Sequence, residues 1–460
     1  MSRLAAVFLA CATTATLAAQ TAAQPATLTL DSAAAWTLRR HPLALAAEAV
    51  ERRGPAELMR ARGAFDPTLR GSYDRKDYLG TEYFEYGQAG LDWQTPFAVK
   101  LEAGREWAEG VFLNAERTVP DAGQAYLGVK LPLLRGLLVD KYRTGVRQGE
   151  VAVDRNRAAA EVIRNELRYD LAVAYTEWAR ALAQLRVYEA TEDLLADYLA
   201  NTRGLVAGGE KPAVDTVEAA LYLTDQQLTT QQAAVEAQLR SQDLTALYFP
   251  LAEGLLVPPE AALLVRFPVD LGLRVTDNPE LAELRAEIAQ LELERRLKRE
   301  YLKPQLDVGY AILGDGFQLA PDAEKVADRT FLTRAYKVGA EFRYPIPNRA
   351  ARGDVRLADI KLAEAAGKLE AKRQQLVAKA TANRAAALQY EAQLVRVDEL
   401  LAQARALLAA ERELFELGES TQFLLNQRAQ NVQKAQTTRL KLLALRAKAI
   451  WAWRQAMGAW

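Results

Sequence analysis

Apolar residues recur at heptad spacing in two long stretches that contain no internal proline, about 137–203 and 349–417. In the first stretch the positions step by four, three, four, four and three: Leu167, Leu171, Ala174, Trp178, Leu182 and Leu185. In the second they repeat every seven residues: Leu394, Leu401, Leu408 and Phe415. This spacing predicts helices that pack along a continuous seam. At 1.5 Å per residue each helix would be about 100 Å long, too long for one compact globule to cover, so the pattern favours assembly into a tube or a fibre.

Each long stretch ends in a glycine-containing segment and is followed by a shorter helical pattern. The first tip is Gly208–Pro212 and the second is Gly418–Ser420. The returning helices are expected at about 213–248 and 421–458. The sequence therefore predicts two long helical hairpins.

An internal repeat organises the chain. His41–Tyr73 aligns without a gap on Asn278–Tyr310, an offset of 237 (278 minus 41). Seven positions are identical: Pro42/Pro279, Ala49/Ala286, Glu57/Glu294, Arg62/Arg299, Pro67/Pro304, Leu69/Leu306 and Tyr73/Tyr310. A capping residue before proline predicts a helix start in each copy, giving helices at 42–63 and 279–303. We divide the chain into a first repeat, 24–276, and a second, 277–460, each with a helix, strands, a long helix and a short helix.

Between these helices the hydrophobic period changes from 3.6 to 2. One set of alternate positions is mainly apolar, Ala89, Leu91, Trp93, Thr95, Phe97, Val99, Leu101 and Ala103, whereas the interleaved positions are polar or small. Strands are expected at 66–79 and 122–131 in the first half, and at 304–314 and 335–344 in the second. A further pair, 86–95 and 98–107, would join through Thr95-Pro96, so the chain supplies four or six strands. The spacers 108–121 and 315–334 would be outer loops.

Alternating segments about ten residues long are typical of lipid-facing barrel strands. The alternative is a small sheet outside the membrane with one solvated face. Four to six strands cannot close a barrel alone, because about eight are needed, so a barrel would be shared between subunits. Helices flank both strand regions, which requires an even number of crossings in each half.

The N-terminus has the features of an export signal at residues 1–23. A short basic start, Met1–Arg3, precedes an apolar segment, Leu4–Ala19, and a small-residue cleavage site, Thr21–Ala23. The alternative is a lipoprotein anchored at Cys11, although only seven apolar residues precede that cysteine. Cys11 is the only cysteine, so the mature chain would have neither disulfides nor thiolate chemistry. No later segment has 18 uninterrupted apolar residues, so no transmembrane helix is expected.

In their order and spacing, these elements resemble the TolC-like outer-membrane efflux protein family. The resemblance covers about 28–458. It rests on His41-Pro42 and Asn278-Pro279 as helix starts, on Leu131–Gly136 as the junction from strand to helix, and on the two tips. It implies an α+β membrane protein with duplicated helical hairpins and a transmembrane β-barrel shared by a homotrimer. It also implies a passive conduit in the outer membrane of a Gram-negative-type cell, joined to a periplasmic adaptor protein and an inner-membrane pump.

The resemblance assigns the aperture and the adaptor-docking surface to the hairpin tips: Gly209, Glu210, Lys211, Asp215, Gly418, Glu419, Ser420 and Thr421. Asp215 matches an aspartate that, in the family, is tied to arginine and tyrosine on the second tip. Here Phe415 and Ser420 stand at those positions, so other contacts must close the gate. Leu424 and Asn426 stand near the positions of the family's acidic ring. Segment 86–107 exceeds the two strands per half usual in the family. Trp93 and Trp107 are candidate membrane-belt aromatics.

The residue inventory does not favour an enzyme. His41, the only histidine, is interpreted as a helix cap, so a histidine- or thiolate-based metal site is not expected, nor is a cofactor. The 59 basic and 59 acidic residues leave no net charge that favours nucleic acid. Two other functions stay open: a periplasmic coiled-coil adaptor and a structural stalk.

Overall fold

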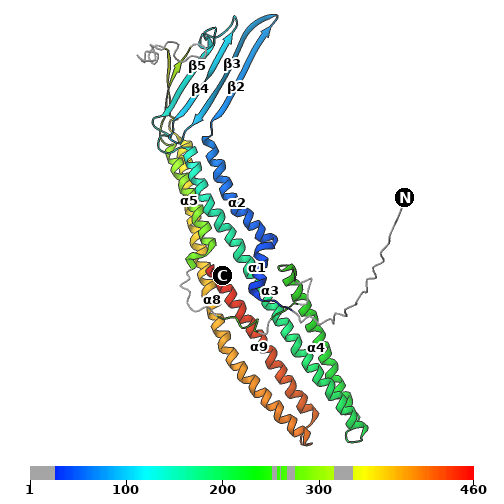
Figure 1. Ribbon diagram of the computed structural model, residues 1–460. Helices are drawn as coiled ribbons and strands as arrows, with labels where there is room; N and C mark the ends of the chain where they lie inside the picture. Colours follow the sequence, from blue (N-terminus) through cyan, green and yellow to red (C-terminus); the bar gives the residue numbers. More distant parts are fainter. Residues whose placement is uncertain (1–25, 251–255, 259–260, 267–274, 315–334) are drawn as a thin grey trace, which may run out of the picture.

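The computed structural model describes residues 26–250, 256–258, 261–266, 275–314 and 335–460. The expected signal peptide and the spacer 315–334 lie outside the described residues. The molecule is elongated, with one β-sheet at one end and a layer of long helices that extends from it to two hairpin tips at the other end (Figure 1). None of the described helices combines the length and apolar character needed to cross a membrane.

The two long helices are present as predicted. Helix α3 spans Lys141–Ala207, 67 residues, and α8 spans Arg349–Glu416, 68 residues. Helix α3 begins four residues later than expected because Asp140 is its N-cap and accepts hydrogen bonds from the backbone of Tyr142 and Arg143 at 2.7 and 2.9 Å. The heptad residues form the buried seams: Leu167, Leu171 and Trp178 on α3, and Leu394 and Leu401 on α8.

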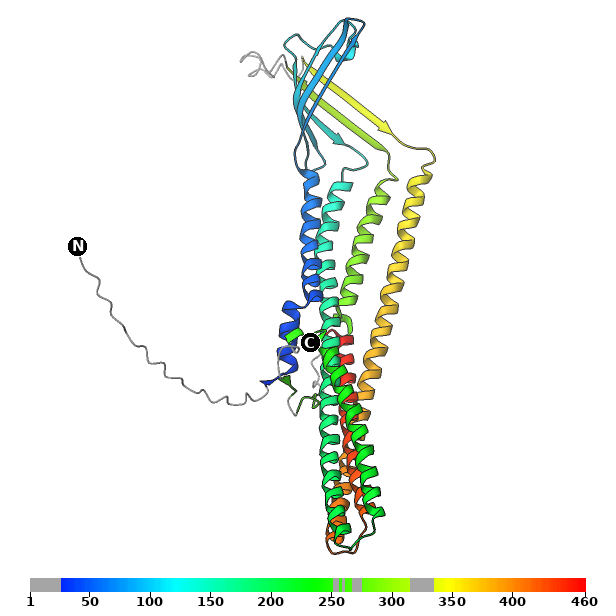
Figure 2. The same ribbon diagram turned by 90° about the vertical axis from the view of Figure 1, so that its right-hand side faces the viewer.

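Four shorter helices complete the layer: α2 (Pro42–Arg62), α4 (Val214–Thr245), α5 (Pro279–Glu300) and α9 (Gln422–Met457). In the tier nearest the sheet the helices lie side by side in the order α2, α3, α5, α8 (Figure 2). In the tier nearest the tips the order is α4, α3, α9, α8. The long helices run through both tiers, and the short helices follow one another along them.

Asn278 joins the two short helices of the second half. Its Oδ1 accepts a hydrogen bond from the backbone N–H of Glu280 at 2.9 Å, which caps α5. Its Nδ2 donates to the carbonyls of Gln455 and Ala456 at 3.1 and 3.0 Å, which caps the end of α9. In the first half, His41 Nδ1 accepts from Leu43 N–H at 3.2 Å, so the predicted capping role of His41 is confirmed.

A short N-terminal helix, α1 (Leu30–Arg40), escaped the sequence analysis because eleven residues are too few to show a seam. It packs on α3 through a cluster that includes Leu28, Ala33 and Tyr175. The Tyr175 hydroxyl donates to the Leu28 carbonyl at 2.8 Å, and burial, with the charge of Asp31, raises the pKa of Tyr175 to about 12. A two-residue strand β1 (Ala26–Thr27) pairs with β6 (Leu256–Val257) beside this cluster.

Six antiparallel strands form the sheet, in the order β2, β3, β4, β5, β7, β8. Their bounds are Thr68–Tyr78, Thr81–Gln94, Lys100–Glu109, Gln124–Pro132, Gln305–Leu313 and Tyr336–Arg343. The first half thus supplies four strands and the second two, which is the larger of the two predicted totals. The β3–β4 turn is closed by Thr95, whose backbone N–H and hydroxyl both donate to the Val99 carbonyl. Both halves place a helix, strands, a long helix and a short helix in that order, and their division at 276/277 stays a prediction.

Candidate functional site

The two hairpin tips end in the same backbone motif. Gly209 and Gly418 have φ values of +76° and +79°, a left-handed conformation that glycine adopts without steric cost. The next backbone N–H groups, those of Glu210 and Glu419, each reach back 2.9 Å to a carbonyl in the last helical turn. Because both glycines close Schellman motifs, the chain reverses sharply at both tips, which lie at the same end of the molecule (Figure 1).

The structure places the predicted tip residues as follows. Gly209, Glu210, Gly418 and Glu419 are exposed. Thr421 is the N-cap of α9, its hydroxyl oxygen accepting a hydrogen bond from a backbone N–H. Asp215 is half-buried in the first turn of α4 and forms no ion pair with any residue that the structure describes.

Lys211 and Ser420 meet other partners than Asp215. The Lys211 ammonium lies 5.0 Å from the centre of the Phe415 ring, a cation–π contact that joins the first tip to the second. The Ser420 hydroxyl donates to the carboxylate of Glu411. Phe415 and Ser420, which stand where the family has partners of the aspartate, therefore each make a contact at the tips, but not with Asp215.

Neutral hydrogen bonds connect the two hairpins above the tips. Thr202 on α3 donates to the side chain of Gln422 on α9 at 2.8 Å. Gln433 on α9 donates 3.1 Å to Gln226 on α4, and Gln226 donates 3.0 Å to the Tyr188 carbonyl on α3. Gln226 and Gln433 are both buried. Since buried amides without partners are costly, this series of hydrogen bonds favours one relative position of the two hairpins.

Glu411 is a tip residue that the sequence analysis missed. Its carboxylate accepts the Ser420 hydroxyl and the Arg428 guanidinium, the latter at 3.3 Å, so α8, the tip and α9 are tied together. The Ser420 hydrogen bond, with that of Arg428, lowers the pKa of Glu411. Its signal was its position three residues after Leu408, on the buried side of the heptad pattern, where a carboxylate needs a partner.

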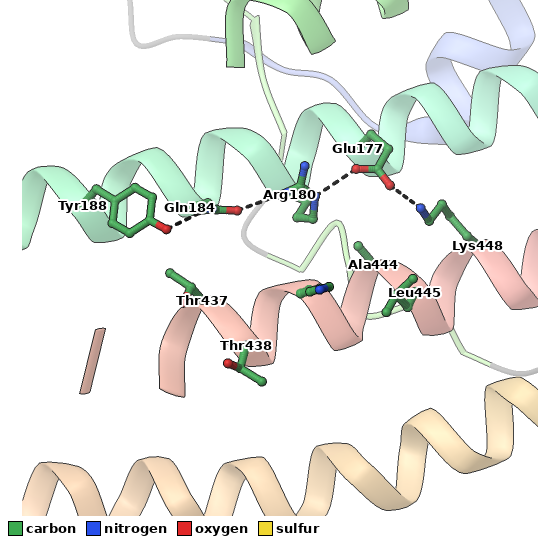
Figure 3. Close-up of a pocket in the computed structure, with 10 residues that line it drawn as sticks. Glu177, Arg180, Gln184, Tyr188, Thr437, Thr438, Ala444, Leu445 and Lys448 are labelled. Carbon is green, nitrogen blue, oxygen red and sulfur yellow. Dashed lines mark hydrogen bonds and ion pairs between the residues drawn. The ribbon is translucent and has the colours of Figure 1, made fainter. Parts of the chain in front are cut away.

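A polar cavity of about 440 Å³ lies between α3 and α9 (Figure 3). Glu177 accepts hydrogen bonds from Arg180 and from Lys448 across the two hairpins, and Arg180 also donates to Glu236 on α4. Gln184 continues the chain, accepting from Arg180 at 2.7 Å. Glu177, Arg180, Glu236 and Lys448 thus form one network of ion pairs that connects α3, α4 and α9 beside the cavity.

The pKa of Glu177 reflects these ion pairs. Burial alone would raise it, but the hydrogen bonds and charges of Lys448 and Arg180 outweigh burial and lower the pKa below its ordinary value of 4.5. The carboxylate is thus ionised at neutral pH. Only 17 % of the Glu177 side chain is exposed, so this carboxylate does not lie on a solvated helix face.

The sheet is amphipathic across its whole width. One face carries the apolar alternate positions of every strand, exemplified by Leu69, Leu91, Val129, Val308 and Val338. Many of these side chains are exposed, Leu69 at 85 % and Val338 at 62 %. An apolar sheet face of this extent, open to the surroundings, marks a surface that contacts lipid or protein.

The opposite face is polar and is braced by a ladder of ion pairs. Arg70 on β2 lies 3.4 Å from Asp92 on β3. Lys100 on β4 reaches Asp92 at 3.0 Å and Glu102 at 2.7 Å, and Lys130 on β5 reaches Glu102 at 2.8 Å. The hairpin β3–β4 is therefore tied to both of its neighbours and forms an integral part of the sheet.

Comparison with known structures gives matches over almost the whole chain. The outer-membrane channel CmeC of Campylobacter jejuni is 12% identical, with a TM-score of 0.65 over 93% of this chain and 85% of that one. The outer-membrane protein VceC of Vibrio cholerae is 14% identical, with a TM-score of 0.65 over 94% and 96%. The outer-membrane channel MtrE of Neisseria gonorrhoeae, in its open state, is 12% identical, with a TM-score of 0.66 over 94% and 89%. The chain has the TolC-like fold. No family model and no curated protein matches the sequence itself.

The two candidate belt aromatics lie toward opposite ends of the hairpin β3–β4. Trp93 lies at the helix-proximal end of β3, where its Nε1 donates 2.9 Å to the Phe65 carbonyl. Trp107 lies opposite Gly87 nearer the far end of β4, and its ring occupies the space that a Cβ at Gly87 would fill. Their role as belts stays a prediction.

The described residues also give no candidate for a metal site. In the parts of the chain that the structure describes, no group of three or more histidine, cysteine, aspartate or glutamate side chains could hold a metal ion.

Proposed function

We propose that the chain is one subunit of a homotrimeric outer-membrane channel, a passive conduit from the periplasm to the exterior. The observation that supports it best is the six-stranded sheet, apolar on one face and polar on the other, at the end of a helical layer about 100 Å long. In three copies, the sheets would form a shared transmembrane barrel and the helices a periplasmic tunnel. Energy for transport would come from an inner-membrane pump.

The height of the apolar face fits this proposal. Trp93 is paired with Leu101, and Trp107 lies six residues further along the same strand (107 minus 101). At about 3.3 Å per residue, the two indoles are about 20 Å apart along the strand, comparable with the apolar band of about 25 Å in outer-membrane barrels. Trp93 and Trp107 would then lie near opposite membrane interfaces.

The two rival functions fit the sheet less well. A coiled-coil adaptor has no need for a continuous apolar face that leaves Leu69 and Val338 exposed. A structural stalk would explain the heptad seams but leaves the amphipathic sheet and its ion-pair ladder without a role. Among the residues that the structure describes, no metal-binding group of histidine, cysteine or carboxylate side chains supports an enzyme.

The test is membrane fractionation followed by detergent extraction and light scattering corrected for detergent. An outer-membrane species of about three times the mass of the mature chain supports the proposal. Single-channel conductance in planar bilayers then tests the conduit directly. A soluble monomer would refute the channel and revive the adaptor or the stalk.

The hairpin tips would form the gate of this conduit. We propose that the Lys211–Phe415 contact and the hydrogen bonds of the Gln226 and Gln433 side-chain amides hold the hairpins in the closed position. Since the hydrogen bonds of the two side-chain amides carry no net charge, their contribution to closure would resist salt, which screens only charges. Gln433→Ala should raise conductance, whereas the matched control Gln430→Ala, at an exposed position of the same helix, should not. Equal conductance in both variants would exclude this closure.

The residues of the two tips would also dock a periplasmic adaptor that links the conduit to its pump. They are Gly209, Glu210, Lys211, Asp215, Gly418, Glu419, Ser420 and Thr421. Photo-crosslinkers at Glu210 and Glu419 should capture an adaptor, whereas one at exposed Met59 on α2, far from the tips, should not. Capture from Met59 alone would contradict docking at the tips.

A further inference from the structure

The six-stranded sheet has two open edges, β2 and β8. An edge strand presents unpaired N–H and C=O groups that favour pairing with another strand. Six strands are too few to close on themselves, because about eight are needed. Strand β2 follows α2 and β8 precedes α8, the two outermost helices of the layer, so both edges lie at its sides.

We propose that β8 of one copy pairs antiparallel with β2 of the next, with Phe342 opposite Leu69, so that three copies close an eighteen-stranded barrel with the polar face inside. This inference rests on the trimeric conduit proposed above. It adds the strand number and the register.

The two faces of the sheet continue across this joint. Phe342 and Leu69 both belong to the apolar face, through the pairs Leu306–Phe342 and Leu69–Leu91. Antiparallel pairing alternates between hydrogen-bonded and open pairs from strand to strand. Strand direction alternates in the same way. Because each copy contributes an even number of strands, the strand direction and the type of pair both continue without a break from one copy to the next.

Charge selects this register among its neighbours. With Phe342 opposite Leu69, the polar face sets Arg70 opposite Glu341 and Asp74 opposite Lys337. Opposite charges directly across a strand pair stabilise it, and like charges destabilise it. The proposed joint therefore has two complementary pairs on the side that faces the pore.

The shifted registers lose both pairs. Sliding β8 by two residues in one direction sets Arg70 opposite Arg343 and Lys76 opposite Lys337, two repulsive pairs. Sliding it by two residues in the other direction sets Arg70 opposite Gly339. A shift by one residue would exchange the apolar and polar faces.

The register also yields an ordinary strand tilt. A row of paired residues crosses the copy from Leu69 to Tyr336: Leu69, Leu91, Ala103, Leu127, Ile312 and Tyr336. In the proposed joint Tyr336 faces Arg75 of the next copy. The row therefore shifts along the strands by six residues per copy (75 minus 69), which gives a total stagger, or shear, of about eighteen residues around the barrel. With about 3.3 Å per residue and 4.8 Å between strands, the tilt is about 35°, within the range of known barrels.

The widths of the sheet and of the helical layer agree as well. Four helices, α2, α3, α5 and α8, span about 32–40 Å at 8–10 Å per helix. Six strands tilted by about 35° occupy about 35 Å around the ring. An eighteen-stranded barrel thus continues a tunnel wall that is four helices wide per copy, without a large step in diameter.

Disulfide trapping tests the joint, since Cys11 is the only native cysteine and lies in the predicted signal peptide. Leu69→Cys with Phe342→Cys should form covalent trimers, because directly opposed Cα atoms are about 4.5–5.5 Å apart. Two shifted pairs are the matched controls: Leu69→Cys with Ala340→Cys, and Gly71→Cys with Phe342→Cys. Their Cα atoms would be about 7–8 Å apart, so we expect at least tenfold less covalent trimer.

A charge exchange gives a second test that needs no cysteine. Asp74→Lys or Lys337→Asp alone should lower the yield of trimer at least threefold, and the two together should restore it. Stronger trapping by a shifted pair, or a double variant worse than both single variants, overturns the register. Trimers by light scattering that trap at none of the three cysteine pairs overturn this inference and leave the conduit standing, whereas a soluble monomer removes the conduit itself.

Discussion

Replacing Asn278 by aspartate would measure what one buried amide contributes to the joint between α5 and α9. Asn278 is fully buried, and it caps α5 through Oδ1 while its Nδ2 donates to the Gln455 and Ala456 carbonyls. Aspartate keeps the size and the capping oxygen but removes both donors. The Gln455 carbonyl would keep a hydrogen bond from Asn165 at 3.0 Å, whereas the Ala456 carbonyl would lose the one from Asn278.

The cost follows from these contacts. Leaving one buried acceptor without its donor costs about 1–3 kcal/mol. A carboxylate beside the negative end of α9 adds about 1–2 kcal/mol in a buried setting. We therefore expect Asn278→Asp to lower the free energy of unfolding by about 2–5 kcal/mol at pH 7.

The cost should depend on pH. A buried carboxylate facing carbonyls has a folded-state pKa above its unfolded value of about 3.9, so the folded state of the variant binds more protons. Its stability then falls as pH rises above about 4 and levels off above the raised pKa. The difference from the wild type should accordingly be small near pH 4 and largest at neutral pH.

The assay is thermal unfolding of the detergent-extracted protein, with hydrogen exchange of the first turn of α5 as a local reading. The matched control is His41→Asp, the equivalent cap in the first repeat, whose ring lies near Phe249 and whose acceptor role a carboxylate retains. Because His41 is buried as well, the control also carries the cost of a buried carboxylate, and we expect its loss of stability to be smaller than that of Asn278→Asp by the lost hydrogen bond, about 1–3 kcal/mol. An equal loss in both variants, or a pH-independent loss in Asn278→Asp, would refute the reasoning.

Two further predictions concern the helical layer. Glu177→Gln should lower stability at pH 7 by about 1–3 kcal/mol, because it removes the charge between Lys448 and Arg180. Since the folded pKa of Glu177 is lowered, the wild type should lose this contribution as pH falls below about 4.5, and the gap between the two melting curves should narrow there; a constant gap would contradict the pKa assignment. Gly54→Ala should destabilise the protein by about 1–3 kcal/mol, because a Cβ would lie 2.8 Å from a backbone carbon of α3. Its control, Gly367→Ala, meets nothing within 4 Å and should stabilise α8 by up to about 1 kcal/mol, so a loss in both variants would argue against close packing as the cause.

The long elements could be predicted from sequence because each carries a signal repeated many times. Helix α3 shows heptad spacing from Leu167 to Leu185, and α8 shows it from Leu394 to Phe415. The second copy of the helix that begins with proline, α5, supported the prediction of the first, α2. Strand count was harder, because each strand gives only a few alternations. The pattern around Thr95-Pro96 left four or six strands open until the pairing was known.

The tip contacts could be predicted only in part. Gly209 and Gly418 follow from turn chemistry, which acts within a few residues. The partners of Phe415, Ser420 and Glu411 depend on how two hairpins lie against each other, and no local pattern encodes that. The same holds for Glu177, whose helix position looks solvated until α9 is placed beside it.

The hairpin β3–β4 occurs in one half of a duplicated chain, and this has a consequence for how such a molecule can change over time. A hairpin leaves and rejoins the sheet on the same side, so its gain or loss disturbs none of the helices. Under threefold symmetry, one such event in one gene would alter the circumference of the assembled ring by six strands at once. Pore width in this architecture could therefore evolve in large steps, each made by a single short insertion or deletion.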